Sequence, residues 1–151
     1  MKVKVYTDGG TYPNPGQGGA GIVIADEDGK VIIELSEKLG ENVTCIQASY
    51  LAIIMGLKKA KDLGAKEVEL YSDSPTVLHQ LSGQINTQAP HLITIRDKVR
   101  SLLGEFRSYE LIYIPAEYNA RAQKLSSLAL DNAPIIKKVR AIGENFKPGP
   151  L

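Results

Sequence analysis

The chain is poor in cysteine, tryptophan and net charge: its 151 residues include one cysteine and no tryptophan, and its formal net charge is +1. The single cysteine, Cys45, excludes an internal disulfide, and with no long apolar run at the start it predicts a reducing, cytoplasmic setting. Near-neutral charge excludes a global attraction to nucleic acid or to an anionic membrane, so phosphate binding needs a local patch. No apolar stretch approaches the roughly twenty residues that span a bilayer, so no membrane partner is expected.

The length and the apolar content of the chain are those of one compact domain. An apolar content of 43% in 151 residues is enough to build a single core. Residues 1–131 are expected to form this domain. Residues 132–151 are expected to form a C-terminal extension, with a short helix over the weak apolar pattern at 135–142 and then a frayed tail.

The first third of the chain predicts three antiparallel strands. Residues 2–7 alternate charged and apolar side chains, which indicates a strand ending at Asp8. A loop rich in glycine and proline is expected over residues 9–19. Residues 20–25 and 30–39 are typical of two further strands, joined as a hairpin by an Asp-Gly turn.

The rest of the chain alternates between helical and strand patterns. Apolar spacing predicts a helix over residues 43–63, a strand over 66–72 and a helix opened by Ser74-Pro75. A helix over 91–106, a strand over 109–114 and a helix over 119–130 follow. The order is βββαβααβα. Because a strand–helix–strand unit requires a parallel neighbour, we expect an α/β fold with a five-stranded mixed sheet flanked by helices.

One glycine motif has to be set aside first. Residues 16–21 match the G-x-G-x-x-G string that cradles a dinucleotide pyrophosphate where a helix begins. Here the β-branched run Ile22-Val23-Ile24 follows, which favours a strand. With no helix N-terminus to face phosphates, nucleotide binding loses its physical basis, and wide turns with close strand packing explain the glycines better.

Several spaced motifs resemble those of the type 1 ribonuclease H family, over residues 2–130. They are Tyr6-Thr7-Asp8-Gly9-Gly10, Asn14-Pro15-Gly16, Gly19-Ala20-Gly21 and Tyr71-Ser72-Asp73-Ser74. The element order also matches the fold of that family. The resemblance implies hydrolysis of the RNA strand of an RNA/DNA hybrid by two Mg²⁺ or Mn²⁺ ions, roughly 3.5–4 Å apart and held by four carboxylates.

By the same resemblance, Asp8 and Asp73 are two of the four metal ligands. The third is a glutamate in a pattern like T-N-N-x-A-E-Y, where this chain has Ser49. The fourth is an aspartate in a pattern like N-x-x-A-D-x-L-A, where this chain has Gln123. Half of the anionic oxygens are therefore missing, and any metal is expected to bind weakly.

The resemblance also implies nucleic-acid contacts, which this chain keeps only in part. The candidate contact residues that remain are Gly9, Gly10, Asn14, Gly16 and Thr44, the last matching a phosphate-pocket threonine. Two asparagines that the family places near the minor groove are replaced by Cys45 and Ile46, which do not offer the same hydrogen bonds to 2′-hydroxyls and base edges.

Several alternatives stay open from the sequence. Asp8 before a glycine is also a common turn former, Asp73 before Ser74-Pro75 is also a possible helix N-cap, and Thr44 is equally a helix-start residue. Three functions compete: a weakened metal-dependent ribonuclease, a module that binds hybrids or other nucleic acid weakly without turnover, and a scaffold for an unknown protein partner. We favour a hybrid-binding, ribonuclease H-like protein with catalysis lost or strongly impaired.

Overall fold

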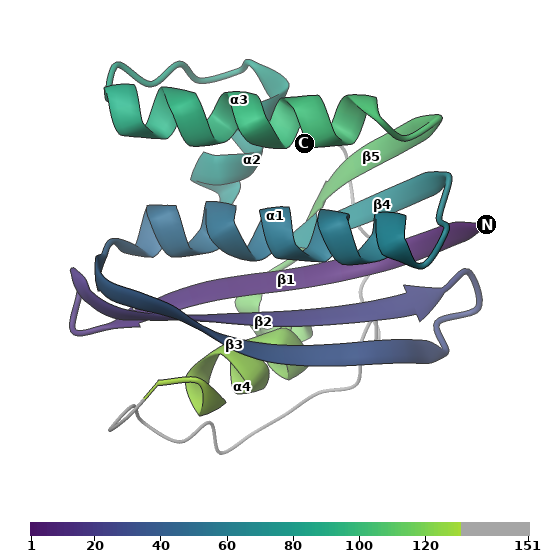
Figure 1. Ribbon diagram of the computed structural model, residues 1–151, viewed down its shortest axis with the longest axis horizontal. Coiled ribbons are helices and arrows are strands. Elements are labelled where there is room, and N and C mark those ends of the chain that lie inside the picture. The colour runs from purple at the N-terminus through teal and green to yellow at the C-terminus, as the bar shows by residue number, and fades with distance from the viewer. Residues whose placement is uncertain (131–151) are drawn as a thin grey trace.

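The computed structural model describes residues 1–130, which form a five-stranded sheet with helices on both faces (Figure 1). The strand order is β3-β2-β1-β4-β5, so the first strand lies in the centre of the sheet. The β1–β2 and β2–β3 pairs are antiparallel, and the β1–β4 and β4–β5 pairs are parallel. The predicted mixed sheet is thus confirmed. The predicted domain end at residue 131 and the extension 132–151 lie outside the described residues.

The strands match the predicted order and are longest in the antiparallel half of the sheet. Their bounds are β1 (Lys2–Tyr12), β2 (Gly16–Asp26), β3 (Val31–Val43), β4 (Glu67–Ser72) and β5 (Ser108–Tyr113). One prediction is wrong: residues 9–19 are mostly strand, because Gly9 pairs with Ala20 and Gly10 pairs with Gly19. Asp8 therefore lies inside β1 and not at its end.

Helices approach the sheet so closely at some strand positions that only glycine, which has no side chain, fits there. A Cβ atom on Gly9 would lie 2.1 Å from the Ala48 carbonyl carbon, and one on Gly21 would lie 1.9 Å from the Ala122 carbonyl oxygen. Their role is close packing. The G-x-G-x-x-G string falls within β2, as the argument against nucleotide binding requires.

The helices cover both faces of the sheet (Figure 1). Their bounds are α1 (Cys45–Asp62), α2 (Pro75–Ser82), α3 (Pro90–Gly104) and α4 (Ala120–Leu128), with a 3₁₀ turn η1 (Ala116–Tyr118) before the last. Gly9 faces α1, whereas Gly10 faces α4. Since neighbouring strand residues point to opposite faces, α1 and α4 sandwich the centre of the sheet (Figure 1).

Each face of the sheet has its own apolar core. One joins the sheet to α1 and α3 and includes the fully buried Val5, Tyr50 and Leu70. The other contains Tyr6 and Tyr71, whose rings stack with centroids 4.4 Å apart. Full burial of one large side chain contributes about 1.5–3 kcal/mol, so both helical layers are held firmly to the sheet. No helix within residues 1–130 is long and apolar enough to cross a membrane.

Polar caps fix where the helices begin. Thr44 caps α1 in a capping box with Gln47, and Ser74 caps α2 by accepting from the Val77 N–H. Asp73 is therefore not the N-cap of α2, and its carboxylate can serve the neighbouring cluster.

Candidate active site

Asp8 and Asp73 lie side by side, where the parallel pairing of β1 with β4 ends. The last paired residues of β1 and β4 are Thr7 and Ser72. Asp8 and Asp73 directly follow them in the chain. Neighbouring strands lie about 4.8 Å apart, so the two side chains emerge at one spot. The Thr7 hydroxyl donates to the Tyr71 carbonyl oxygen at 3.2 Å and ties the strands together just below it.

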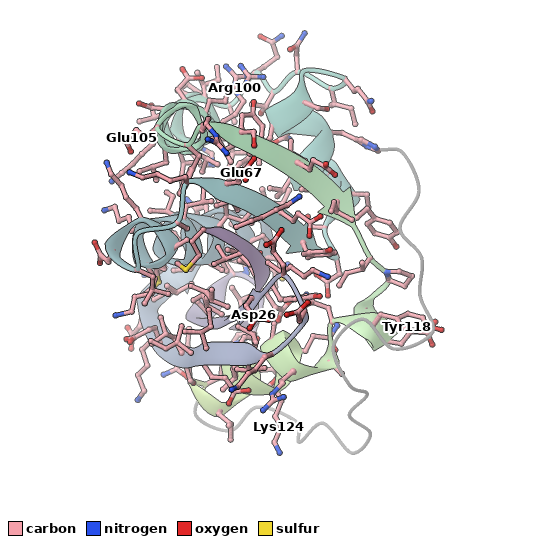
Figure 2. The ribbon with its side chains drawn as sticks, turned by 90° about the vertical axis from the view of Figure 1, so that its right-hand side faces the viewer. Asp26, Glu67, Arg100, Glu105, Tyr118 and Lys124 are labelled. Atoms are coloured by element: carbon pink, nitrogen blue, oxygen red, sulfur yellow. The ribbon has the colours of Figure 1, made fainter. Side chains whose placement is uncertain are left out.

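Helix α4 brings two neutral side chains to these carboxylates. The Gln123 amide donates from Nε2 to Asp73 Oδ2 at 2.9 Å, and the Ser126 hydroxyl donates to Asp8 Oδ2 at 2.6 Å. The two residues share the face of α4 turned to the sheet, because positions three apart on a helix are neighbours. Lys124 between them is exposed and points away from the sheet (Figure 2). The cluster is thus two carboxylates, each accepting a hydrogen bond from α4.

Asn119 anchors the start of α4 beside the cluster. Its amide donates from Nδ2 to the Thr7 carbonyl oxygen at 2.8 Å, and its side chain is 1% exposed. Its Oδ1 is buried and accepts no hydrogen bond within residues 1–130. Because Thr7 directly precedes Asp8, this bond fixes α4 relative to the strand that carries the central aspartate.

Two effects raise the pKa of Asp8 above that of an ordinary aspartate. Burial, and then the negative charge of Asp73, raise the pKa of Asp8 to about 7, while the Ser126 hydrogen bond acts to lower that pKa. The side chains that donate to these two carboxylates are the neutral Gln123 and Ser126. The pair therefore carries less than two full negative charges near neutral pH.

Ser49 lies on the α1 side of β1, beside Gly9, and offers no carboxylate. Its backbone nitrogen faces Gly9, where a Cβ atom would lie 2.4 Å away, and Gly9 directly follows Asp8. The serine side chain is two bonds shorter than a glutamate arm and is uncharged.

The residues present do not fit a pair of divalent cations. Mg²⁺ is bound through the lone pairs of oxygen atoms, which come from carboxylates, phosphates and waters. Here Gln123 presents an N–H to the cluster, and its orientation follows from Asp73 being an acceptor. One oxygen of Asp8 is occupied by the Ser126 hydroxyl. Within residues 1–130, no group of three or more His, Cys, Asp or Glu side chains is placed to hold a metal.

The predicted nucleic-acid contacts gather near the start of α1. The Thr44 hydroxyl accepts from the Gln47 N–H and lies within hydrogen-bond distance of Gln47 Oε1, both at 3.2 Å. Asn14 Oδ1 accepts from the Cys45 N–H at 3.2 Å, which fastens the β1–β2 loop to the helix. Both side chains have structural roles, so their contact with nucleic acid stays a prediction.

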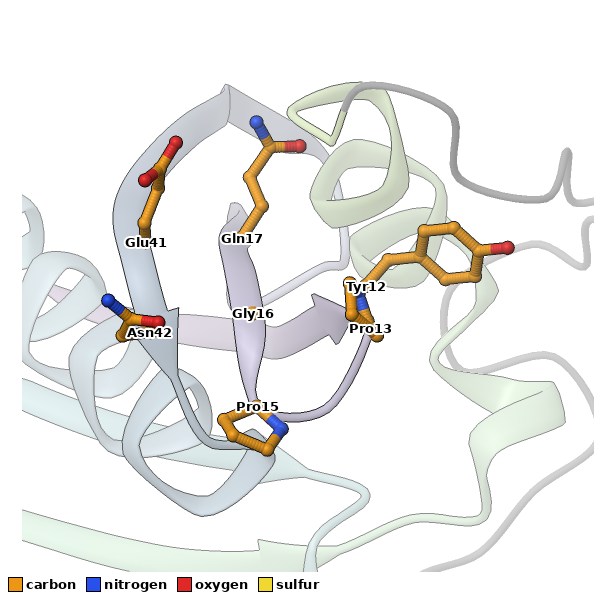
Figure 3. Close-up of a pocket in the computed structure, with 7 residues that line it drawn as sticks. All are labelled: Tyr12, Pro13, Pro15, Gly16, Gln17, Glu41 and Asn42. Atoms are coloured by element: carbon orange, nitrogen blue, oxygen red, sulfur yellow. The ribbon is translucent and has the colours of Figure 1, made fainter.

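A surface pocket of about 530 Å³ lies beside this region (Figure 3). It is lined by Tyr12, Pro13, Pro15, Gly16, Gln17, Glu41 and Asn42. Gly16 is its only predicted contact residue. The pocket is separate from the aspartate cluster and contributes no group to it.

Ser126 and Asn119 are two site residues that sequence reasoning does not single out. A signal for Ser126 is present: it follows Gln123 by three residues on a helix, where the family pattern has an alanine. A polar residue at a small apolar position on the same helical face as a ligand position predicts a partner at the site. Asn119 matches the asparagine of the pattern N-x-x-A-D-x-L-A. Its hydrogen bond to the Thr7 carbonyl oxygen follows only from the fold.

Comparison with known proteins supports the family resemblance that the sequence motifs indicate. A family model described as reverse transcriptase-like matches residues 6–129. Ribonuclease HI of Halobacterium salinarum is 36% identical over 132 residues, which is 87% of this chain and 66% of that protein. The bifunctional protein Rv2228c of Mycobacterium tuberculosis is 32% identical over 133 residues, which is 88% of this chain and 36% of that protein. The chain thus spans less than two thirds of either relative.

Solved structures agree closely with the fold. The crystal structure of the halobacterial RNase H1 superimposes with a TM-score of 0.85 and covers 88% of this chain and 100% of that one. LC11-RNase H1, solved in complex with an RNA/DNA hybrid, superimposes with a TM-score of 0.81 at 34% identity and covers 87% and 98%. With its family motifs, its strand order and these matches, the chain belongs to the type 1 ribonuclease H family.

Proposed function

We propose that this protein is a ribonuclease H-family domain that binds RNA/DNA hybrids and whose metal-dependent cleavage is strongly impaired. The observation that carries the proposal is the Gln123 amide at the fourth ligand position, which donates a hydrogen bond to Asp73. A ligand position that donates a hydrogen cannot also donate a lone pair to a metal from the same atom.

Charge balance supports the impairment. Two Mg²⁺ ions carry four positive charges, which four carboxylates and one scissile phosphate balance in the family pattern. This chain offers Asp8 and Asp73 alone, and the pKa of Asp8 near 7 reduces their combined charge further. Each missing anionic ligand is worth a few kcal/mol of transition-state stabilisation, about a hundred- to thousandfold in rate.

Hybrid binding rests on the fold and on relatives. LC11-RNase H1, with a TM-score of 0.81 to this chain, has been solved with an RNA/DNA hybrid. The β1–β2 loop and the start of α1, which hold the predicted contact residues, are joined by the Asn14–Cys45 hydrogen bond. Binding is expected to be weak, because the net charge is near +1 and the two minor-groove asparagines are replaced.

A second candidate function is an active ribonuclease H with a depleted carboxylate site. It is favoured by one observation: Asp8 and Asp73 still lie side by side, directly after the last paired residues of β1 and β4, as a metal site requires. The two functions differ in whether hybrid cleavage depends on Asp8.

The test measures cleavage and binding of one labelled hybrid. Cleavage is followed with Mg²⁺ or Mn²⁺ for the unmodified protein and for Asp8→Asn, and binding by fluorescence anisotropy against duplex DNA. We expect hybrid binding with no cleavage above the Asp8→Asn background. Cleavage that Asp8→Asn abolishes would establish the active enzyme instead, and neither binding nor cleavage would leave a protein-binding scaffold.

A further inference from the structure

We propose that Ser126 is a separate determinant of metal exclusion, acting with Gln123 to hold the two retained aspartates in a metal-free hydrogen-bonded cluster. The proposal deepens the proposed function, because it assigns the impairment to a donated hydrogen bond as well as to the two missing acids. It makes Ser126 a positioning residue for Asp8.

The first support is where the family pattern and this chain differ on α4. Asn119, Ala122 and Leu125 match the pattern N-x-x-A-D-x-L-A, whereas Gln123 and Ser126 depart from it. Both departures donate a hydrogen bond to a retained aspartate, one to Asp73 and one to Asp8. Departures driven by packing alone would not both end on the carboxylates.

The second support is the burial of the serine hydroxyl. Ser126 is 3% exposed, and a buried hydroxyl is unfavourable unless it has a hydrogen-bond partner. Two acceptors are within reach: Asp8 Oδ2 at 2.6 Å and the Gln123 carbonyl oxygen at 3.2 Å. The shorter bond is the charge-assisted one, which is the stronger kind. The hydroxyl is thus aimed at Asp8, one of the two acidic ligand positions that this chain retains.

The third support is that α4 cannot easily withdraw the hydroxyl. The backbone of Ser126 packs on glycines of β2: a Cβ atom on Gly19 would lie 2.5 Å from the Ser126 carbonyl oxygen, and one on Gly21 would lie 2.6 Å from its nitrogen. Ser36 of β3 donates to the Leu125 carbonyl oxygen at 2.5 Å. The helix backbone is therefore fixed on both sides of Ser126.

A cation at Asp8 would have to displace this hydroxyl. Restoring only the missing acids, by Ser49→Glu and Gln123→Asp, leaves the Ser126 O–H on the oxygen that a metal needs. Replacing the hydroxyl with the alanine of the family pattern frees that oxygen without changing the charge of the site. We therefore expect metal affinity to depend on Ser126 even when all four acids are present.

The experiment compares Mn²⁺ binding, by calorimetry, in the Ser49→Glu/Gln123→Asp variant with and without Ser126→Ala. We expect the added Ser126→Ala to tighten Mn²⁺ binding by about tenfold, the effect of one charge-assisted hydrogen bond. Ser127→Ala in the same background is the matched control, because Ser127 is the next residue of α4, and it should leave the affinity unchanged. Circular dichroism checks that each variant is folded.

Equal Mn²⁺ affinities with and without Ser126→Ala would overturn the proposal and make Ser126 a packing residue. If the variant with four acids does not fold, the same comparison is made with Gln123→Asp alone, with and without Ser126→Ala, under the same criteria. The readout is independent of nuclease activity. Cleavage by the unmodified protein would therefore refute the proposed function, whereas equal affinities would refute only the role of Ser126.

Discussion

At the scale of single residues, the site is explained by what surrounds Asp8. Its carboxyl group is half-buried beside Asp73, with hydrogen-bond donors from α4 where the family pattern implies cations. The pKa of Asp8 is raised to about 7 by burial and by the charge of Asp73. A carboxyl group with a raised pKa favours the folded state in its protonated form.

This raised pKa predicts how stability depends on pH. The folded protein keeps the Asp8 proton up to about pH 7, whereas the unfolded chain releases it near the ordinary value of 3.8. The stabilising contribution is thus complete below about pH 4 and is lost as the pH rises toward 7. In Asp8→Asn this loss should be absent, and at pH 8 the variant should be about 1–3 kcal/mol more stable. Urea unfolding at several pH values measures it. Parallel pH profiles of the two proteins would refute the assignment to Asp8.

Gln123 gives a second prediction at this scale. Gln123→Asp places a third carboxylate beside Asp8 and Asp73 and removes the N–H that Asp73 accepts. Without metal, like-charge repulsion and the lost hydrogen bond should lower the free energy of unfolding by about 1–3 kcal/mol. Thermal unfolding in EDTA measures the loss. Lys124→Asp, an exposed change one residue away, is the control, and an equal loss there would show that the effect is not specific to the site.

At the scale of helices and strands, the spacing of apolar residues in the sequence predicts the type and order of the elements. The order βββαβααβα follows from apolar spacing. The caps do not: for Thr44 a cap is one of two interpretations that the sequence leaves open, and the cap of α2 is Ser74, where the sequence also allowed Asp73. Residues 9–19 are predicted as a loop because glycine is common both in turns and in closely packed strands, and the sequence does not distinguish the two. Glycine forms turns, and it also permits a helix backbone to touch a strand, as α1 does at Gly9. Only the packed structure distinguishes the two.

The same limit applies to the site. The sequence predicts four site residues from short strings with characteristic spacing: Asp8, Asp73, Ser49 and Gln123. The roles of Ser126 and Asn119 depend on the distance between α4 and β1, which no local pattern encodes. Their hydrogen bonds to Asp8 and to the Thr7 carbonyl oxygen therefore appear only in three dimensions.

Close packing of α4 predicts the effect of adding one methyl group. In Gly21→Ala the new Cβ would lie 1.9 Å from the Ala122 carbonyl oxygen, so α4 must shift. Overpacking of this kind should destabilise the protein by about 2–3 kcal/mol. Gly104→Ala is the matched control, because nothing lies within 4 Å of the Cβ position there. Chemical denaturation of both variants measures the difference, and equal stabilities would contradict the close contact of α4 with β2.

At the scale of the whole molecule, the chain keeps the fold of the type 1 ribonuclease H family. Its net charge of +1 provides little long-range attraction to a polyanion. If the protein binds hybrids as proposed, binding must come from a limited surface, for which the predicted contact residues indicate the β1–β2 loop and the start of α1. The affinity should therefore fall with salt, but with a shallow slope, since few phosphates are neutralised.

Metal removal distinguishes a binding domain from an enzyme in the whole protein. If the cluster holds no divalent cations, replacing Mg²⁺ by EDTA at matched ionic strength should leave the hybrid affinity of the unmodified protein unchanged within about twofold. The variant Ser49→Glu/Gln123→Asp/Ser126→Ala should behave differently, because four carboxylates repel the phosphate backbone until cations neutralise them. Its affinity should fall in EDTA by about tenfold or more. Fluorescence anisotropy with one labelled hybrid measures both proteins. A metal requirement in the unmodified protein would mean that Asp8 and Asp73 hold a cation despite their hydrogen bonds to Ser126 and Gln123.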